Sequence, residues 1–318
     1  MLNAAQQAVF DAAGEGFELQ PQDTAATGGA GAAAATALDS GARLLIGPLF
    51  AADVSEVAPL AQQAHLPILP LSSDVSLARP GVYVMGHDPA AQVDRVVSYA
   101  AQHGSNGFAA LIPETPYGDL VAKALQTSVA RQGKNLIGIE RVAPDGKNLD
   151  AAVKKIAAQR KGIDALFLPE SGEALKKTVA RLAAAGIDSA HLHALGTGVW
   201  DDANGIALLP LLKGAWYAAP DPALRMRFSA AYKEAYGGEP PRLATLAYDA
   251  TALAAAMAKH GHVDGEAGLA NPNGFAGLDG IFRLKQTGEV ERGLAVIEWG
   301  EAGRYVVDPA PKSFGSGL

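Results

Sequence analysis

The chain contains no cysteine, and this absence removes several kinds of chemistry at once. Disulfide bonds, zinc ribbons, thiolate nucleophiles and iron–sulfur ligation all require thiols. Aromatic residues make up only 6% of the 318 residues, and no Lys/Arg cluster is interleaved with them. The formal net charge of −7 also opposes the basic surface that neutralises phosphates. Nucleic acid is therefore not an expected partner.

Long apolar runs are also missing. No stretch of about 18 apolar residues, the length of a transmembrane helix, occurs in the chain. The N-terminal residues lack the charged start, apolar middle and cleavage site of a signal peptide, although a processed chain would look the same. We therefore expect a soluble chain without a transmembrane segment.

The composition that remains is that of a globular protein. Hydrophobic residues account for 49% of the chain and charged residues for 19%, which is ample for a packed core. A single core seldom serves 318 residues, so two domains of about 150 residues are expected.

Short apolar runs alternate with segments of helical periodicity along most of the chain, which predicts βα units and a parallel sheet. The expected strands are 17–21, 42–47, 66–71, 81–86, 107–113, 135–141, 164–169, 191–196 and 214–219. The expected helices are 1–13, 29–39, 52–64, 89–103, 116–132, 148–160, 172–185, 222–236 and 242–260. After residue 277 the pattern changes: "GIFRLKQTGEVERGLAVIEW" (280–299) predicts a strand, a tight Thr-Gly turn and one longer strand, which add antiparallel at a sheet edge.

Polar residues gather directly after the expected strands. The segments are "GPLFAAD" (47–53), "LSSDVS" (71–76), "PETPYGD" (113–119), "PESGE" (169–173) and "GTGVWDD" (196–202). Ligands of open α/β sheets bind at the carboxyl ends of the strands, where helix N-termini present unpaired amides. These loops therefore predict a ligand cleft, with a small polar pocket built from Ser72, Ser73, Tyr117, Glu170, Ser171, Thr197 and Trp200.

Each of these residues also has an ordinary structural explanation. Ser171 and Thr115 are suitable helix N-caps, and the carboxylate of Glu170 is favourably placed near a helix dipole. Tyr117 and Trp200 are either core aromatics or cleft residues, and the Ser72–Ser73 pair is either a turn or a ligand contact. The convergence of five such loops favours the ligand site.

Enzymatic and metal chemistry have weaker support. Glu114 and Glu170 are a candidate carboxylate pair for glycoside hydrolysis, but nothing in the sequence sets their separation. His191 and His193 lie two residues apart without a third ligand nearby, which favours a structural role over a metal site. "TGGAG" (27–31) lacks the GK[ST] ending of a phosphate loop, and no GxSxG motif occurs. We expect no catalytic residue, cofactor or metal.

In the order and spacing of its phrases the chain resembles the type I periplasmic solute-binding proteins of the branched-chain amino acid receptor superfamily. The matching phrases include "GARLLIGPLFAADVSEVAPLAQQAHLPILPLSSD", "FAALIPETPYGD", "IDALFLPESGEAL", "LATLAYDATALAAAMAKH" and "GLDGIFRLKQTGEVERG". The resemblance implies an α/β fold with two doubly wound lobes, joined by three crossovers, that close on a ligand by a hinge motion.

By this resemblance lobe I comprises 1–87 and 220–287, and lobe II comprises 88–219 and 288–318. The ligand positions of the family fall on Phe50, Ala51, Ser72, Ser73, Asp74, Tyr117, Ser171 and Thr197 to Val199. Such receptors begin with a central strand and a ligand-contacting loop, whereas this sequence begins at what resembles the following helix.

Two positions depart from the receptor pattern. Ala51 replaces the hydroxyl that usually binds the ligand carboxylate, and Gly198 lies where an acidic residue usually binds the ligand amino group. Leaving a zwitterion unpaired in a dry cleft costs several kcal/mol, which argues against a conventional amino acid ligand. A cation contact from Glu170 is one way to restore part of this binding.

Within the superfamily, "IGPLFAADVSEVAP", "LGTGVWDD", "PPRLATLAYDA" and "NPNGFAGLDGIFR" are most similar to lipoprotein activators of penicillin-binding proteins. The resemblance implies a non-enzymatic periplasmic protein that contacts a peptidoglycan synthase at the outer membrane, through a lipid-bearing cysteine upstream of Met1. The alternative is a solute receptor that serves an ABC permease and binds an amino acid or a related polar metabolite. A glycan hydrolase using Glu114 and Glu170 is the remote alternative.

Overall fold

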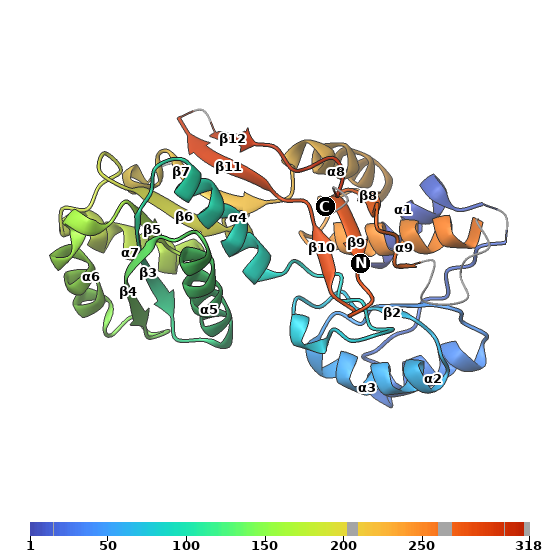
Figure 1. The fold of residues 1–318 in the computed structure, drawn as a ribbon. Helices are drawn as coiled ribbons and strands as arrows, with labels where there is room; N and C mark the ends of the chain where they lie inside the picture. Colours follow the sequence, from blue (N-terminus) through green and yellow to red (C-terminus); the bar gives the residue numbers. More distant parts are fainter. Residues whose placement is uncertain (15, 202–208, 260–268, 302, 315–318) are drawn as a thin grey trace. The chain divides into compact units, whose positions relative to one another are not determined.

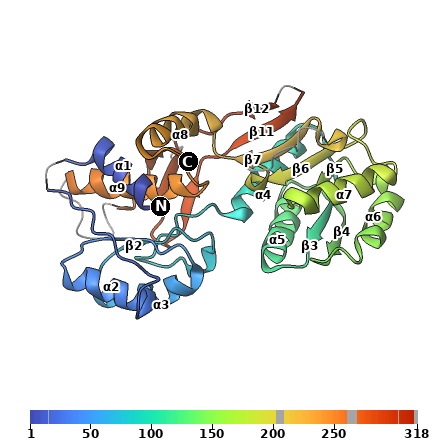
Figure 2. The same ribbon diagram turned by 180° about the vertical axis from the view of Figure 1, so that it is seen from behind.

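The computed structural model describes residues 1–14, 16–201, 209–259, 269–301 and 303–314, which fold as two compact units (Figures 1 and 2). Unit 1 comprises Met1–Asp88, Asp221–Gly293 and Pro311–Leu318, and unit 2 comprises Pro89–Pro220 and Leu294–Ala310. The chain therefore passes from one unit to the other after residues 88, 220, 293 and 310.

Unit 2 is built on a seven-stranded sheet with the order β12-β11-β7-β6-β5-β3-β4. Its strands are β3 (Gly107–Pro113), β4 (Asn135–Val142), β5 (Ala165–Phe167), β6 (His193–Thr197), β7 (Ala215–Ala219), β11 (Ala295–Gly300) and β12 (Gly303–Asp308). The first five are parallel, while β11 pairs antiparallel with both β7 and β12. The carboxyl ends of β3, β5, β6 and β7 therefore share one edge of the sheet.

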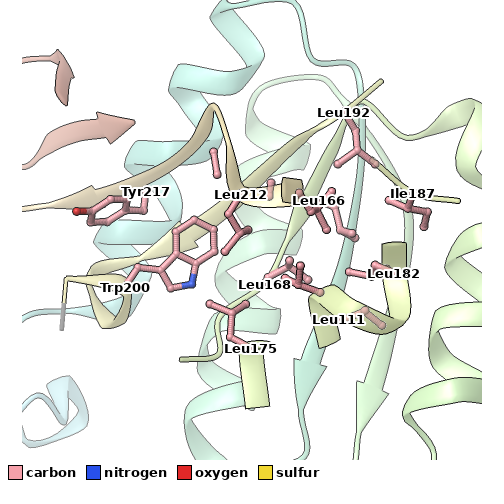
Figure 3. Packing of buried hydrophobic residues seen from close by; sticks show 14 of the residues in the cluster. Leu111, Leu166, Leu168, Leu175, Leu182, Ile187, Leu192, Trp200, Leu212 and Tyr217 are labelled. Atoms are coloured by element: carbon pink, nitrogen blue, oxygen red, sulfur yellow. The ribbon is translucent and has the colours of Figure 1, made fainter. Parts of the chain in front are cut away.

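Helices cover both faces of this sheet. Helices α4 (Pro89–Gln102) and α5 (Pro116–Arg131) pack with Phe108, Ala110 and Ile112 of β3. Helices α6 (Leu149–Ala158) and α7 (Gly172–Ala184) pack with the intervening residues, Ala109 and Leu111. Successive side chains of β3 alternate between two apolar layers, which explains why the strand is apolar at every position. Figure 3 shows the layer that contains Leu111, Leu166 and Trp200.

Unit 1 contains two small sheets between its helices. The parallel pair is β1 (Leu45–Ile46) with β2 (Ile68–Leu69), and the antiparallel sheet has the order β10-β9-β8, from Val290–Arg292, Gly280–Leu284 and Phe275–Gly277. The helices are α1 (Leu2–Ala12), α2 (Gly29–Asp39), α3 (Ala51–Gln63), α8 (Pro222–Tyr236) and α9 (Ala244–Lys259). One apolar cluster joins α2, α3, β2 and Val82, and another joins β2, α8, α9 and β9.

The predicted α/β class with a sheet dominated by parallel strands is confirmed. Two expected strands are absent from the described secondary structure: residues 17–21 are not in a strand, and of 81–86 only Val82 makes isolated bridges, with Ile68 and Arg79. The expected strands 42–47 and 66–71 shrink to two residues each.

The boundaries between the units differ from the expected ones near the C-terminus. Residues 290–292 pair antiparallel with β9 and therefore stay in unit 1, and the chain joins the sheet of unit 2 only from Leu294 onward. The C-terminal segment then returns to unit 1, where the guanidinium of Arg283 lies 4.7 Å from the ring centroid of Phe314. This return adds a fourth passage to the three that were expected.

Candidate functional site

In unit 2, the loops after β3 and β6 meet through two hydroxyl groups. The Tyr117 hydroxyl on α5 lies 2.8 Å from the Thr197 Oγ1 at the end of β6. Thr197 is fully buried, whereas Tyr117 is half-buried. Two residues that the sequence analysis assigned to the pocket, 80 positions apart in the chain, are therefore in direct contact.

The starts of α5 and α7 differ in how they are capped. The Thr115 Oγ1 accepts a hydrogen bond from the Gly118 amide at 3.1 Å, so Thr115 has the structural role of an N-cap. Ser171 occupies the N-cap position of α7 without a side-chain capping bond, and it is exposed. The backbone amides of the first turn of α7 and the Ser171 hydroxyl therefore lie close together after β5. They do not hydrogen-bond each other.

The carboxyl group of Glu170, next to Ser171, is turned toward α7. The Thr178 Oγ1 donates a hydrogen bond to the Glu170 Oε2 at 2.8 Å. Burial raises the pKa of Glu170, against the lowering effect of the bond from Thr178. The Glu170 Oε2 therefore already has a hydrogen-bond partner within unit 2.

Trp200 corrects one expectation, because its ring is not exposed to a ligand. The side chain is fully buried in the core layer of α6 and α7, where Figure 3 shows it between Leu175, Leu212 and Tyr217. Its Nε1 donates to the Glu170 carbonyl at 2.9 Å. Trp200 is therefore a core aromatic, and its Nε1 supports the backbone of the loop that carries Glu170 and Ser171.

The backbone of Gly198 has a partner that the sequence analysis missed. The Gly198 amide donates to the Oε1 of Gln92, a buried residue of α4, at 2.7 Å. A Cβ on Gly198 would lie 3.2 Å from the same oxygen. Gln92 thus holds the loop after β6 in place. The sequence could not predict this contact from a local motif, because Gln92 and Gly198 are 106 positions apart.

In unit 1, the loop after β2 is largely self-contained. The Ser72 Oγ accepts from the Asp74 amide at 3.1 Å, and the Asp74 Oδ1 accepts from the amide and the hydroxyl of Ser76 at 3.1 and 2.6 Å. Ser72 is buried, while Ser73 is exposed. The turn explanation therefore accounts for Ser72 and Asp74, and Ser73 is the member of this loop that presents its side chain.

The start of α3 resembles the start of α7. Phe50 is the N-cap residue, makes no side-chain capping bond and is 67% exposed. Ala51 begins the helix and has no hydroxyl to offer. Asp53 lies in the first turn, where its charge is favourable next to the helix dipole.

A cavity of about 800 Å³ lies elsewhere in unit 1. Its walls come from α1, α2, α9, the segment 16–24 and the residues around β1. None of the predicted ligand residues lines this cavity, although Pro48 and Leu71 of its wall precede the two loops described above. The cavity and the polar loops are therefore separate features.

In the part of the chain that the structure describes, no three His, Asp or Glu side chains come together as a metal site, and no helix has the length and apolarity to cross a membrane. His191 pairs with Asp188 at 2.7 Å, and His193 stacks on Trp216 with 3.9 Å between the ring centroids. Both histidines thus have structural partners.

The two α/β units, with the parallel sheet of unit 2, have the fold of the type I periplasmic binding proteins. The model of the family described as "Periplasmic binding protein" matches residues 1–304, and the chain belongs to this family.

Solved structures similar to the chain have the same fold at low identity. A putative branched-chain amino acid ABC transporter protein from Rhodospirillum rubrum is 18% identical over 96% of this chain and 94% of its own, with a TM-score of 0.82. An ABC transporter substrate-binding protein from Desulfitobacterium hafniense, in complex with Leu, is 18% identical over 96% and 95%, with a TM-score of 0.70. A solute-binding protein from Rhodopseudomonas palustris BisB5, in complex with 3,4-dihydroxybenzoic acid, is 18% identical over 97% and 90%, with a TM-score of 0.66.

A curated relative, the uncharacterized protein RP748 of Rickettsia prowazekii, is 24% identical over 115 residues. The match covers 36% of this chain and 31% of the relative, so the chain spans about a third of that protein's length in the match.

Proposed function

We propose that the chain is a non-enzymatic periplasmic receptor that binds a small organic carboxylate and delivers it to an ABC transporter. The observation that carries this proposal is the start of α7, where the exposed Ser171 hydroxyl and the uncapped amides of the first turn lie together after β5. Family membership supports the general class, and the uncapped helix start supports the chemistry of the ligand.

A carboxylate fits this helix start for two physical reasons. The first-turn amides of a helix lack intrahelical acceptors, and the helix dipole places a partial positive charge there. A carboxylate that accepts from these amides and from Ser171 makes charge-assisted hydrogen bonds, which are about twice as strong as neutral ones. The bound ligands of two similar proteins, Leu and 3,4-dihydroxybenzoic acid, both contain a carboxyl group.

The acidic residues predicted for the site have other partners. Asp74 accepts two bonds from Ser76, and Glu170 accepts from Thr178 while its pKa is raised by burial. Gly198 adds no charge to receive an ammonium group. We therefore propose a carboxylate without a free amino group in preference to a zwitterionic amino acid.

Matched ligand pairs test this preference by thermal unfolding. L-leucine is compared with 4-methylpentanoate, which lacks only the amino group, and benzoate is compared with benzyl alcohol, which lacks the carboxylate. A ligand at about 100 times its Kd stabilises the folded state by about 2.7 kcal/mol, which raises Tm by about 5 °C or more. We expect shifts from 4-methylpentanoate or benzoate and not from their partners.

The Ser171→Ala variant should bind the active carboxylate about tenfold more weakly, the equivalent of about 1.4 kcal/mol. Thr127→Ala is the matched control, because the Thr127 hydroxyl is exposed and bonds only the Lys123 carbonyl of its own helix. A carboxylate panel that leaves Tm unchanged contradicts the receptor proposal, and an equal shift from L-leucine and 4-methylpentanoate contradicts the preference.

The activator role, with an outer-membrane lipid anchor and a peptidoglycan synthase as partner, stays a prediction from the sequence resemblance. It gains weight if the carboxylate panel fails and a purified synthase of this class binds the folded chain.

A further inference from the structure

Two of the passages between the units consist of short segments without regular secondary structure. Residues 86–88 lead from unit 1 into α4 of unit 2, and Gly293 and Leu294 connect β10 of unit 1 to β11 of unit 2. Any change of orientation between the units has to bend these segments, so the contacts on either side of them determine how freely they bend.

On the side of unit 1, a buried arginine joins the two segments. Arg292, the last residue of β10, donates from Nη2 to the Met85 carbonyl at 3.0 Å. Its Nη1 lies 3.4 Å from the Asp249 Oδ2, and its guanidinium lies 5.0 Å from the ring centroid of Phe282. Its side chain is only 4% exposed, so this is a desolvated contact and not a surface ion pair.

The first segment is held by a second buried carboxyl. The Asp279 Oδ2 lies 3.1 Å from the His87 Nε2 and accepts from the Thr245 Oγ1 at 2.7 Å. Asp249 in turn accepts from the Leu278 amide at 2.7 Å. The two carboxyl groups thus come from α9 and the β8–β9 turn: Asp279 contacts His87 directly, and Asp249 is linked to the Met85 carbonyl through Arg292.

On the side of unit 2, a second arginine makes the corresponding link. Arg95 of α4 donates from Nε to the Leu294 carbonyl at 2.9 Å, and its Nη2 lies 2.8 Å from the Asp308 Oδ2. The helix that begins where the first segment enters unit 2 is therefore tied to the start of the second segment.

We propose that Arg292 in unit 1 and Arg95 in unit 2 each tie the two connecting segments together, one on each side of the unit boundary. These two ties, called brackets below, confine bending to the residues between them, near 86–89 and 293. This inference concerns the two connecting segments alone and goes beyond the proposed ligand binding. Without a bracket the two segments can move independently, which permits more orientations of the two units. With both brackets they move together as one short pivot.

Variants of each bracket differ in their risk to folding. Arg95 is 25% exposed, so Arg95→Gln removes the bracket of unit 2 without leaving a fully buried charge unpaired. Arg292→Gln alone would leave the buried Asp249 carboxylate without its cation. The double variant Asp249→Asn/Arg292→Gln removes both charges together and is the appropriate test of the bracket of unit 1.

The absence of cysteine allows clean site-specific labelling. Exposed residues Gln63 of α3 and Gln126 of α5 are replaced by cysteine and spin-labelled, and the distance distribution between the labels is measured without ligand. We expect a broader distribution in Arg95→Gln and in Asp249→Asn/Arg292→Gln than in the labelled parent. Amides of residues 86–88 and 293–295 should also exchange with deuterium about tenfold faster than in the parent.

The control variants remove cations that bind within one unit, away from the two connecting segments. Arg141→Gln removes a contact with the Gly118 carbonyl and Asp119 in unit 2, and Lys233→Gln removes a pair with Glu239 in unit 1. Neither should broaden the distribution.

A folded Arg95→Gln variant with the distribution of the parent, or equal broadening in the two controls, overturns the proposal. If Arg95→Gln does not fold, as judged by loss of its circular dichroism signal, Arg95→Lys is measured instead. Lysine keeps the charge beside Asp308 but lacks the Nε donor, so the same broadening is expected and the same outcomes overturn the proposal. Because no ligand is present in this measurement, its outcome is independent of the carboxylate screen.

Discussion

Gly196 is a position where one added carbon atom should disturb the candidate site. It lies in β6, and a Cβ built on it would stand 2.5 Å from Cδ2 and 2.6 Å from Cζ2 of Trp200. Non-bonded carbon atoms are favourable at about 3.5–4.0 Å. In a Gly196→Ala variant the Trp200 ring, or the strand itself, therefore has to move by about 1 Å to restore a normal separation.

The ring has little room for that movement. It is fully buried, and its Nε1 bonds the Glu170 carbonyl. Overpacking of a core costs about 1–3 kcal/mol, and weakening a hydrogen bond of this kind costs about 1 kcal/mol more. We expect Gly196→Ala to lower the free energy of unfolding by about 3 kcal/mol. Because the Glu170 carbonyl would shift with the ring, ligand binding near Ser171 should weaken as well.

Urea unfolding of a double-mutant cycle tests the cause. Gly196→Ala, Trp200→Phe and the double variant are compared with Gly138→Ala, a strand glycine of β4 whose added Cβ would meet only the Gln159 Nε2 at 3.8 Å. The smaller phenyl ring should relieve the clash, so the double variant should be more stable than additivity predicts by about 1 kcal/mol or more. An additive cycle, or a cost of Gly196→Ala no larger than that of Gly138→Ala, refutes the reasoning.

Two further predictions follow from the cap positions and the buried carboxyl groups. Thr115→Ala should lower the free energy of unfolding, measured in urea, by about 1 kcal/mol, whereas Ser171→Ala should change it by no more than about 0.5 kcal/mol. Equal effects of the two substitutions would contradict the capping assignment. Burial raises the pKa of Asp249 above its ordinary 3.8, so the folded chain holds a proton there more tightly than the unfolded chain does. The stability that this shift contributes is complete below about pH 3.8 and declines as the pH rises above that value. Unfolding midpoints of Asp249→Asn should therefore decline less with rising pH than those of the parent, and parallel declines would argue against this assignment.

Helices could be predicted from the sequence more accurately than strands, for reasons that particular elements show. The expected helices 29–39 and 222–236 coincide with α2 and α8, because periodicity and terminal residues are local signals. The expected strand 42–47 contains only the two-residue β1, because a strand is recognised by pairing and β1 pairs only at Leu45 and Ile46.

The unit boundary near Gly293 illustrates a second limit. "EVERGLAVIEW" (289–299) has the composition of one long strand, and the sequence analysis treated it so. In the structure β10 and β11 belong to different sheets, and the Gly293 amide bonds the Ile281 carbonyl of β9 at 2.8 Å. Which sheet a strand joins depends on partners far away in the chain, and composition does not report them.

The candidate site shows the same division between local and distant information. Thr115 and Ser171 each follow a strand and precede a helix in nearly the same phrase, yet one hydroxyl caps its helix and the other does not. The two positions differ in the contacts of the neighbouring residues. Next to Ser171, the Trp200 Nε1 donates to the Glu170 carbonyl, and the Thr178 hydroxyl holds the Glu170 side chain toward α7. These contacts span 30 and 8 residues, so the first is invisible to a local pattern. Because other residues hold the neighbours of Ser171 in place, this loop can leave its own hydrogen-bond donors without a partner. Hydrogen-bond donors of this kind, at the end of a parallel strand, are what an anionic ligand requires.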